Sequence, residues 1–191
     1  RGKDLLNEFI ILENKRLKNI VDDYLVKSDA VFAKVLSDKG SPFLKSIIIN
    51  KGSKHNISLG MIAMDGEYLV GKVVEVNYMS SRVLLLSDLN SKIPVIIEPN
   101  EVFSILSGTG KNYGVIQYSK KYEDIKSESI IYTSGAGSLF KAGMPVGKII
   151  KNKFKEIKEG LPINKIKVEF FSDFSQLRFV EIFSFTKKET E

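Results

Sequence analysis

The sequence contains no cysteine, a single histidine and no long apolar run. The absence of cysteine excludes disulfide frameworks and thiolate metal sites, and it leaves the redox compartment open. Because His55 is the only histidine, a histidine-rich metal centre is also excluded, and we expect neither a metal nor a cofactor. No window approaches about 18 consecutive apolar residues, so no transmembrane helix is predicted within the sequence.

Arginine is scarce as well. The net charge is +6, but the only arginines are Arg1, Arg16, Arg82 and Arg178, so lysine carries most of the positive charge. Lysine lacks the bidentate fork with which arginine recognises phosphate or guanine. We therefore expect no nucleic-acid partner. The alternative is a basic, OB-type β-barrel that binds nucleic acid by stacking bases on aromatic side chains such as Tyr118.

The sequence has enough apolar residues, 43%, to bury a core. Residues 4–27 contain no proline or glycine and carry apolar residues at helical spacing, which predicts a helix. The heptad pattern places Ile10, Leu17 and Tyr24 at d positions and Asn7, Asn14 and Val21 at a positions. A buried asparagine pair can fix register and strand number, so this pattern favours a parallel homodimer. The predicted interface consists of Ile10, Asn14, Leu17, Val21 and Tyr24. An amphipathic helix packed on its own domain is the alternative.

From residue 30 onward the period changes to short runs rich in Val, Ile, Phe and Tyr, separated by Gly, Asn, Asp and Pro. Such runs predict many short strands, and therefore a sandwich or small barrels. The expected strands are Val31–Leu36, Ser46–Asn50, Leu69–Val76, Arg82–Leu86, Ile93–Ile97, Val102–Leu106, Gly114–Tyr118, Ile130–Thr133, Val146–Ile150, Lys165–Phe171 and Arg178–Phe185. The predicted fold class is mainly β, with an N-terminal coiled-coil helix followed by two small barrels of about six strands each.

An internal repeat supports two barrels. Gly52 and Gly60-Met61 recur as Gly135 and Gly143-Met144, and Val70-Gly71-Lys72-Val73 is matched by Val146-Gly147-Lys148-Ile149. We expect each repeated glycine to supply either a positive φ or a close approach between backbones where a strand turns a barrel corner. The structural turn residues are therefore Gly52, Gly60, Gly71, Gly135, Gly143 and Gly147.

No catalytic constellation is predicted. His55 lies in a polar turn among lysines, without the nucleophile and orienting carboxylate of a triad. Ser107–Lys111 lacks the first glycine and the final hydroxyl of a phosphate-binding loop. Thr133–Ser138 lacks the G-x-S-x-G motif of a nucleophile elbow, so a glycine-rich barrel turn is the preferred interpretation. Glu123 and Glu128, considered as a carboxylate pair for glycoside hydrolysis, lie in a charged stretch typical of a solvated loop. We therefore expect a protein that is not an enzyme.

The order of the motifs resembles the rod shape-determining protein MreC family. The motifs that carry the resemblance are Ile10-x-x-Glu13-Asn14-x-x-Leu17, Ile49-Asn50-Lys51-Gly52-Ser53 with Gly60-Met61, Val70-Gly71-Lys72-Val73, Leu85-Leu86-Ser87-Asp88, and Thr133-Ser134-Gly135 followed by Phe140, Gly143 and Val146-Gly147. The sequence departs from the family pattern at Glu128-Ser129, at Lys141 and at Tyr68, which are all turn positions.

The resemblance implies a domain order and a function. Residues 1–28 would form the dimerising helix, residues 29–78 and 163–186 the first barrel, residues 79–162 a second, inserted barrel, and residues 187–191 a disordered tail. The family implies a scaffold at the periplasmic, extracytoplasmic face of the inner membrane, with a single-pass anchor upstream of Arg1. Its implied partners are a second copy, MreB, MreD, the elongation-specific penicillin-binding transpeptidase and a RodA-type glycosyltransferase, and filaments are left open. Phe43, Tyr113 and Tyr122 are candidate exposed anchors for partners, with a core role as the alternative.

Overall fold

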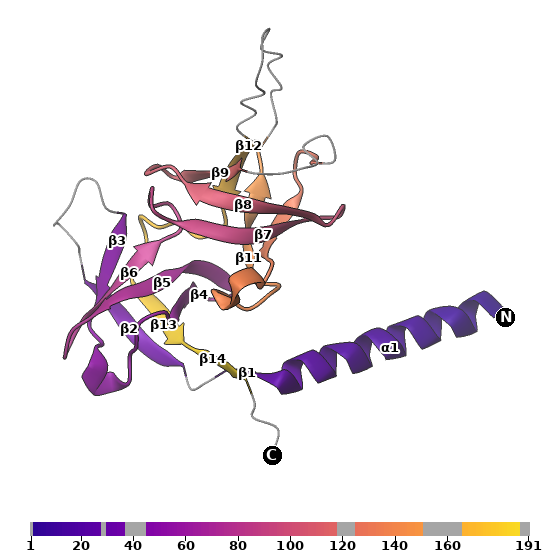
Figure 1. The fold of residues 1–191 in the computed structure, drawn as a ribbon, viewed down its shortest axis with the longest axis horizontal. Coiled ribbons are helices and arrows are strands. Elements are labelled where there is room, and N and C mark those ends of the chain that lie inside the picture. Colours follow the sequence, from indigo (N-terminus) through magenta and orange to yellow (C-terminus); the bar gives the residue numbers. More distant parts are fainter. Residues whose placement is uncertain (1, 28–29, 37–44, 118–124, 151–165, 188–191) are drawn as a thin grey trace, which may run out of the picture.

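The structure, a computed structural model, consists of one long helix and two closed β-barrels (Figure 1). It describes residues 2–27, 30–36, 45–117, 125–150 and 166–187. Each barrel has six strands, all paired antiparallel, so every strand is hydrogen-bonded on both sides and neither barrel has a free edge. This confirms the predicted fold class.

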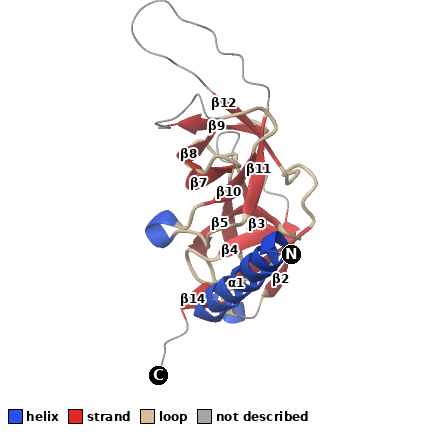
Figure 2. Ribbon diagram, turned by 90° about the vertical axis from the view of Figure 1, so that its right-hand side faces the viewer, coloured by secondary structure: helices blue, strands red, loops and turns tan. Residues whose placement is uncertain are grey.

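The helix α1 (Gly2–Tyr24) extends away from both barrels. In Figures 1 and 2 it leaves from the end of the molecule that the first barrel occupies. The apolar side chains of its first half are exposed by 47–66%: Leu5, Leu6, Phe9, Ile10, Ile11 and Leu12. Asn14 is exposed too. A helix with this much exposed apolar surface does not gain its stability by packing on its own barrels.

The helix ends earlier than predicted. It stops at Tyr24, and Leu25–Lys27 form a short strand, β1, that pairs antiparallel with β14 (Phe185–Lys187) near the other end of the chain. Helical periodicity continues to residue 27 in the sequence, but pairing with a distant strand overrides local propensity here. Lys187, expected in a disordered tail, belongs to β14, while residues 188–191 lie outside the described residues.

The first barrel contains strands from both ends of the sequence. Its strands are β2 (Val31–Leu36), β3 (Ser46–Ile49), β4 (Ile62–Asp65), β5 (Tyr68–Val76), β6 (Ser81–Leu85) and β13 (Phe179–Phe183). They close in the order β13-β2-β3-β6-β5-β4. A short 3₁₀ helix, η1 (Ser53–His55), lies between β3 and β4. The interior is filled by small and β-branched side chains, among them Ala33, Ile49, Val70, Val83 and Ile182.

The second barrel is continuous in sequence. Its strands are β7 (Lys92–Glu98), β8 (Val102–Gly108), β9 (Tyr113–Gln117), β10 (Ile130–Thr133), β11 (Pro145–Ile149) and β12 (Ile166–Phe170), in the order β10-β11-β12-β9-β8-β7. A 3₁₀ turn, η3 (Ala136–Ser138), lies between β10 and β11. Val95, Leu106, Ile116, Ile131 and Val168 are among its buried core residues.

The second barrel is inserted between β6 and β13, but the predicted boundaries were wrong at both ends. Ser81–Leu85, assigned to the second barrel, pairs with β3 and β5 of the first. Ile166–Phe170, assigned to the first barrel, pairs with β9 and β11 of the second. Alternating polarity shows that a strand has one buried face, but only its hydrogen-bonding partners determine which barrel it completes.

The two barrels are circular permutants of one topology. Matching β13 to β7 also matches β2 to β8, β3 to β9, β6 to β12, β5 to β11 and β4 to β10. The strand that closes the first barrel is its last in sequence, whereas the corresponding strand of the second barrel is its first. Gly71 and Gly147 therefore occupy equivalent strands, β5 and β11. The other repeated glycines occupy different connections, β3 to β4 in one barrel and β10 to β11 in the other.

The barrels share a buried interface. Ile62, Met64 and Leu69 on β4 and β5 are buried in the same apolar cluster as the core of the second barrel. Leu86, at the start of the connection to the second barrel, and Phe183, at the end of β13, belong to this cluster too. Because one apolar cluster spans both barrels, they form a single packed unit.

Candidate functional site

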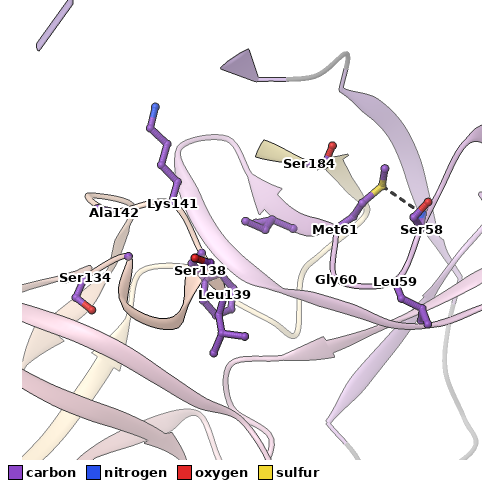
Figure 3. A pocket seen from close by; sticks show the side chains of 13 residues that line it. Ser58, Leu59, Gly60, Met61, Ser134, Ser138, Leu139, Lys141, Ala142 and Ser184 are labelled. Atoms are coloured by element: carbon purple, nitrogen blue, oxygen red, sulfur yellow. Dashed lines mark hydrogen bonds between the residues drawn. The ribbon is translucent and has the colours of Figure 1, made fainter. Parts of the chain in front are cut away.

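A groove of about 730 Å³ lies between the two barrels (Figure 3). The first barrel contributes Ser58, Leu59, Gly60, Met61, Ile62 and Ser184, and the second contributes Ser134, Gly135, Ser138, Leu139, Phe140, Lys141 and Ala142. Most of these residues belong to two turns, 58–61 and 134–142. We call this site the inter-barrel groove.

Glycines allow both turns to adopt their conformation. Gly60 and Gly143 have φ values of +84° and +83°, and a Cβ built on either would meet no atom within 4 Å. Their requirement is therefore conformational, because a side chain at such a φ is strained even in open space. The Sδ of Met61 accepts a hydrogen bond from the Ser58 backbone N–H at 3.4 Å, across the first turn (Figure 3).

Thr133 holds the second turn in place. Its backbone accepts a hydrogen bond from the Gly143 N–H at 2.8 Å, and its own N–H donates to the Met144 carbonyl at 2.9 Å. The Thr133 hydroxyl donates to the Lys141 carbonyl and accepts from the Met144 N–H. The side chain is fully buried, so these bonds have no water to compete with them. The base of the 134–142 turn is thus fixed to the second barrel.

Two other glycines are required by close packing of backbones. A Cβ on Gly71 would lie 2.0 Å from the Leu84 carbonyl oxygen, and one on Gly147 would lie 2.2 Å from the Glu169 carbonyl oxygen. Both contacts are made with the next strand of the same barrel, β6 for Gly71 and β12 for Gly147. No other residue fits at either position without separating the strands.

The remaining two glycines of the repeat begin the 3₁₀ turns. Gly52 precedes η1, where a Cβ would lie 2.1 Å from the Asn77 carbonyl oxygen. Gly135 precedes η3 with a φ of +75°. Of the two, only Gly135 lines the inter-barrel groove.

Asp88 joins the two barrels and is fully buried. It lies in the connection between β6 and β7. Its Oδ2 accepts a hydrogen bond from the Lys45 N–H, directly before β3 of the first barrel, at 2.8 Å. Its Oδ1 accepts one from the Asn90 N–H, near β7 of the second barrel, at 2.7 Å. One carboxylate therefore holds backbone groups that lead into different barrels, and hydrogen bonds to a charged acceptor are the stronger kind.

The residues considered for catalysis or phosphate binding in the sequence do not form a common site in the described part of the structure. His55 is half-buried in η1, where its Nδ1 accepts a hydrogen bond from the Gly52 N–H at 3.3 Å. Ser107–Lys111 spans the end of β8 and the start of the turn that leads to β9, and its Thr109 hydroxyl donates to the Tyr113 carbonyl. Within the described part of the chain, no three His, Cys, Asp or Glu side chains are grouped so as to hold a metal ion.

The carboxylate pair considered for hydrolysis is not visible as a pair. Glu123 lies outside the described residues, and Glu128 forms an exposed ion pair with Lys148 at 3.6 Å. Lys148 also contacts Glu169 at 3.3 Å. The hydrogen bond to Glu169 and the nearby charge of Glu128 raise the pKa of the Lys148 ammonium. This arrangement is an ion-pair network on the outside of the second barrel.

The predicted anchor and interface residues have mixed positions. Tyr113 is half-buried with the Lys167 ammonium 4.8 Å from its ring centroid, and Phe43, Tyr118 and Tyr122 lie outside the described residues. On α1, Ile10 and Asn14 are exposed in the single chain, and the side chains of Leu17, Val21 and Tyr24 lie outside the described part of the structure. The helix interface therefore stays a prediction.

Sequence reasoning missed three features of the site. The first two are the leucines of the groove, Leu59 and Leu139, which lie within the turns 58–61 and 134–142. The third is the burial of Asp88, which had been noted only as part of a motif. The available signal for Leu59 was its position directly before the repeated Gly60, whereas Leu139 lies four residues from both Gly135 and Gly143 and had no such signal.

Together, the fold and the groove define a helix-and-tandem-barrel protein with an open groove between its barrels. The MreC barrel-core model (rod shape-determining protein MreC) matches residues 35–184. The cell shape-determining protein MreC of Cereibacter sphaeroides is 31% identical over 148 residues, which cover 78% of this chain and 46% of that protein. The chain belongs to the MreC family of non-catalytic cell shape-determining proteins, as its motif order predicted. It spans about half the length of the curated relatives it matches.

Solved structures agree with this assignment. The crystal structure of MreC from Pseudomonas aeruginosa superposes with a TM-score of 0.74 at 28% identity, covering 81% of this chain and 99% of that one. A structure described as the major periplasmic domain of the filament MreC has a TM-score of 0.68 at 20% identity, over 84% and 99% of the two chains. A complex between a penicillin-binding protein and MreC from Helicobacter pylori shares the fold, with a TM-score of 0.60 at 17% identity over 84% and 100%. Over the described residues, no helix has the length and apolarity to cross a membrane.

Proposed function

We propose that this chain is the extracytoplasmic part of a non-enzymatic scaffold that maintains rod shape by binding, and thereby activating, enzymes of lateral cell-wall synthesis. The inter-barrel groove is the observation that carries the proposal. It is open and lined mainly by apolar side chains and serine hydroxyls, a composition that suits a segment of a protein. A relative whose structure was solved in complex with a penicillin-binding protein supports a transpeptidase as the principal partner.

The rest of the assembly follows from family membership. We propose that an anchor upstream of Arg1 places the chain on the periplasmic side of the inner membrane. There it would connect MreB and MreD to the elongation-specific transpeptidase and to a RodA-type glycosyltransferase. The relative described as a periplasmic domain supports this location. No metal or cofactor enters this function.

Binding of the transpeptidase tests the proposal. We expect the extracytoplasmic part of the elongation-specific transpeptidase, immobilised on a biosensor, to bind this chain saturably with a Kd of roughly micromolar or tighter. The matched arm measures binding of a single-stranded oligonucleotide at low and high salt. A basic barrel that binds nucleic acid would bind it tightly at low salt, and its affinity would fall steeply as the salt concentration rises. Absence of transpeptidase binding, or tight oligonucleotide binding in its place, would overturn the proposed function.

We further propose that the scaffold is a parallel homodimer through α1. The helix projects from the barrels with apolar side chains exposed, which is the state expected for one half of a coiled coil. The proposed contacts are Ile10, Asn14, Leu17, Val21 and Tyr24. Whether dimers assemble further into filaments depends on surfaces beyond this helix.

The substitution Asn14→Leu tests the register of that dimer. With Asn14 at a buried a position, we expect the change to stabilise the helix pair but shift its oligomeric state or register, because the polar residue specifies both. Sedimentation equilibrium gives the state, and disulfide cross-linking of single cysteines placed on α1 gives the register. The control is Lys15→Leu on the neighbouring position of the helix. An unchanged mass and cross-linking pattern for Asn14→Leu would contradict the assignment.

A further inference from the structure

Each wall of the inter-barrel groove presents a leucine to solvent. Leu59 on the first barrel is 68% exposed and Leu139 on the second is 42% exposed. Two other lining residues, Phe140 on the second barrel and Ile62 on the first, are buried in the apolar cluster that joins the barrels. Phe140 and Ile62 thus give the groove an apolar base that belongs to the core, and its two walls carry the exposed leucines, Leu59 and Leu139, labelled in Figure 3.

The backbone of the second wall adopts positive φ values directly before Leu139. Ser138 has a φ of +54°, which is uncommon for a residue other than glycine, and Gly137 before it has a φ of +70°. This reversal separates Leu139, which is exposed, from Phe140, which is buried. Strain of this kind persists where the surrounding structure enforces it, and it concentrates at sites that bind ligands. Thr133 supplies that enforcement at the base of the same turn.

The polar part of the lining is positive. Among the described residues that line the groove, Lys141 is the only charged side chain, and Ser58, Ser134, Ser138 and Ser184 bring hydroxyl groups. An ammonium group has three N–H donors, so Lys141 can bind an added carboxylate alongside an existing partner. Serine hydroxyls both donate and accept, and they suit the N–H and C=O groups of an extended backbone.

We propose that the inter-barrel groove binds an extended segment of the partner protein in which a large apolar side chain lies close to an aspartate or glutamate. The apolar side chain packs between Leu59 and Leu139, and the carboxylate pairs with Lys141. The inference rests on the proposed function, since it assigns the binding surface for the transpeptidase. A protein segment suits the groove because its described lining combines apolar side chains, hydroxyl groups and one cation.

The test compares groove variants for binding to the extracytoplasmic part of the elongation-specific transpeptidase. We expect Leu59→Asp and Leu139→Asp each to weaken binding by about tenfold or more, because each adds an uncompensated charge where an apolar side chain is buried. Lys141→Glu should weaken binding by several-fold and reduce its dependence on salt. The matched control is Phe103→Asp, which replaces an apolar side chain, 65% exposed on β8, outside the groove, and should change the Kd less than about twofold. Far-ultraviolet circular dichroism confirms that each variant is folded.

The possible results distinguish an error in the assignment of the groove from an error in the proposed function. Binding by the unaltered chain with no loss in Leu59→Asp and Leu139→Asp overturns the groove assignment and leaves the proposed function standing. An equal loss in Phe103→Asp overturns it as well, because the effect would not be specific to the groove. Unchanged binding by Lys141→Glu overturns the acidic character of the segment. A change in self-association of Leu139→Asp, measured by sedimentation, would assign the groove to a second copy instead. No binding by the unaltered chain removes the proposed function and the inference together.

Discussion

Replacing Gly71 by alanine is expected to destabilise the first barrel by about 3 kcal/mol or more, an effect at the upper end of overpacking. The added Cβ would lie 2.0 Å from the Leu84 carbonyl oxygen and 2.9 Å from the Leu84 carbonyl carbon. Both atoms are backbone, so no side chain can rotate to make room. Strands β5 and β6 would have to separate, with loss of ladder hydrogen bonds. Urea unfolding followed by circular dichroism measures the loss.

Two variants give this experiment its reference points. Gly147→Ala makes the same change at the equivalent strand of the second barrel, with a Cβ 2.2 Å from the Glu169 carbonyl oxygen, and should cost a similar amount. Val74→Ala changes a residue on the same strand as Gly71 whose side chain is 40% exposed, and should cost less than about 1 kcal/mol. A Gly71→Ala barrel as stable as Val74→Ala would show that β5 and β6 do not pack as closely as described.

Replacing Asp88 by alanine is expected to lower the free energy of unfolding by about 2–4 kcal/mol, because the Lys45 and Asn90 N–H groups would lose the acceptor that the buried carboxylate supplies. Asp88→Asn keeps one carbonyl oxygen and should lose about half as much. Asp88→Ala should also loosen the two barrels relative to each other, because the carboxylate accepts hydrogen bonds from residues that precede β3 of the first barrel and β7 of the second.

The absence of cysteine makes that second effect measurable. Cysteines introduced at Leu59 and Leu139 are the only labelling sites in the chain, and spin labels on them report the distance across the inter-barrel groove. We expect a broader distance distribution in Asp88→Ala than in the parent. A distribution of unchanged width, together with lower stability, would show that Asp88 stabilises the connection without setting the width of the groove.

Most strands could be predicted because residues that favour strands are followed by residues that favour turns. Val31–Leu36 and Ile130–Thr133 have the predicted limits, since β-branched and aromatic residues stand between clear turn signals there. Strand β4 (Ile62–Asp65) was missed because Ala63 and Met64 favour a helix. Its pairing with β5 and β13 overrides that preference, and β13 is more than a hundred residues away in the sequence.

The candidate site was only partly predictable for a similar reason. The repeat marked Gly60, Gly135 and Gly143, because a demand for a positive φ restricts the residue type locally. The groove itself depends on how the two barrels pack against each other, which no local pattern records. Asp88 is hydrophilic and stands in a turn. The Asn90 N–H from which it accepts a hydrogen bond is local, but the Lys45 N–H comes from a residue before β3 of the first barrel, and no local pattern records that contact.

The insertion of one barrel in the other constrains the order in which the protein can be made. The chain is synthesised from its N-terminus, so β2 to β6 are made early. One edge of β2 and one edge of β4 nevertheless stay unpaired until Phe179–Phe183 have been synthesised. By then all the strands of the second barrel have been synthesised and can already have closed. The inner domain is therefore the one that can mature first, and the outer domain is completed around it. A chain that stopped before residue 179 would carry a finished barrel on an open sheet whose two exposed edges invite aggregation.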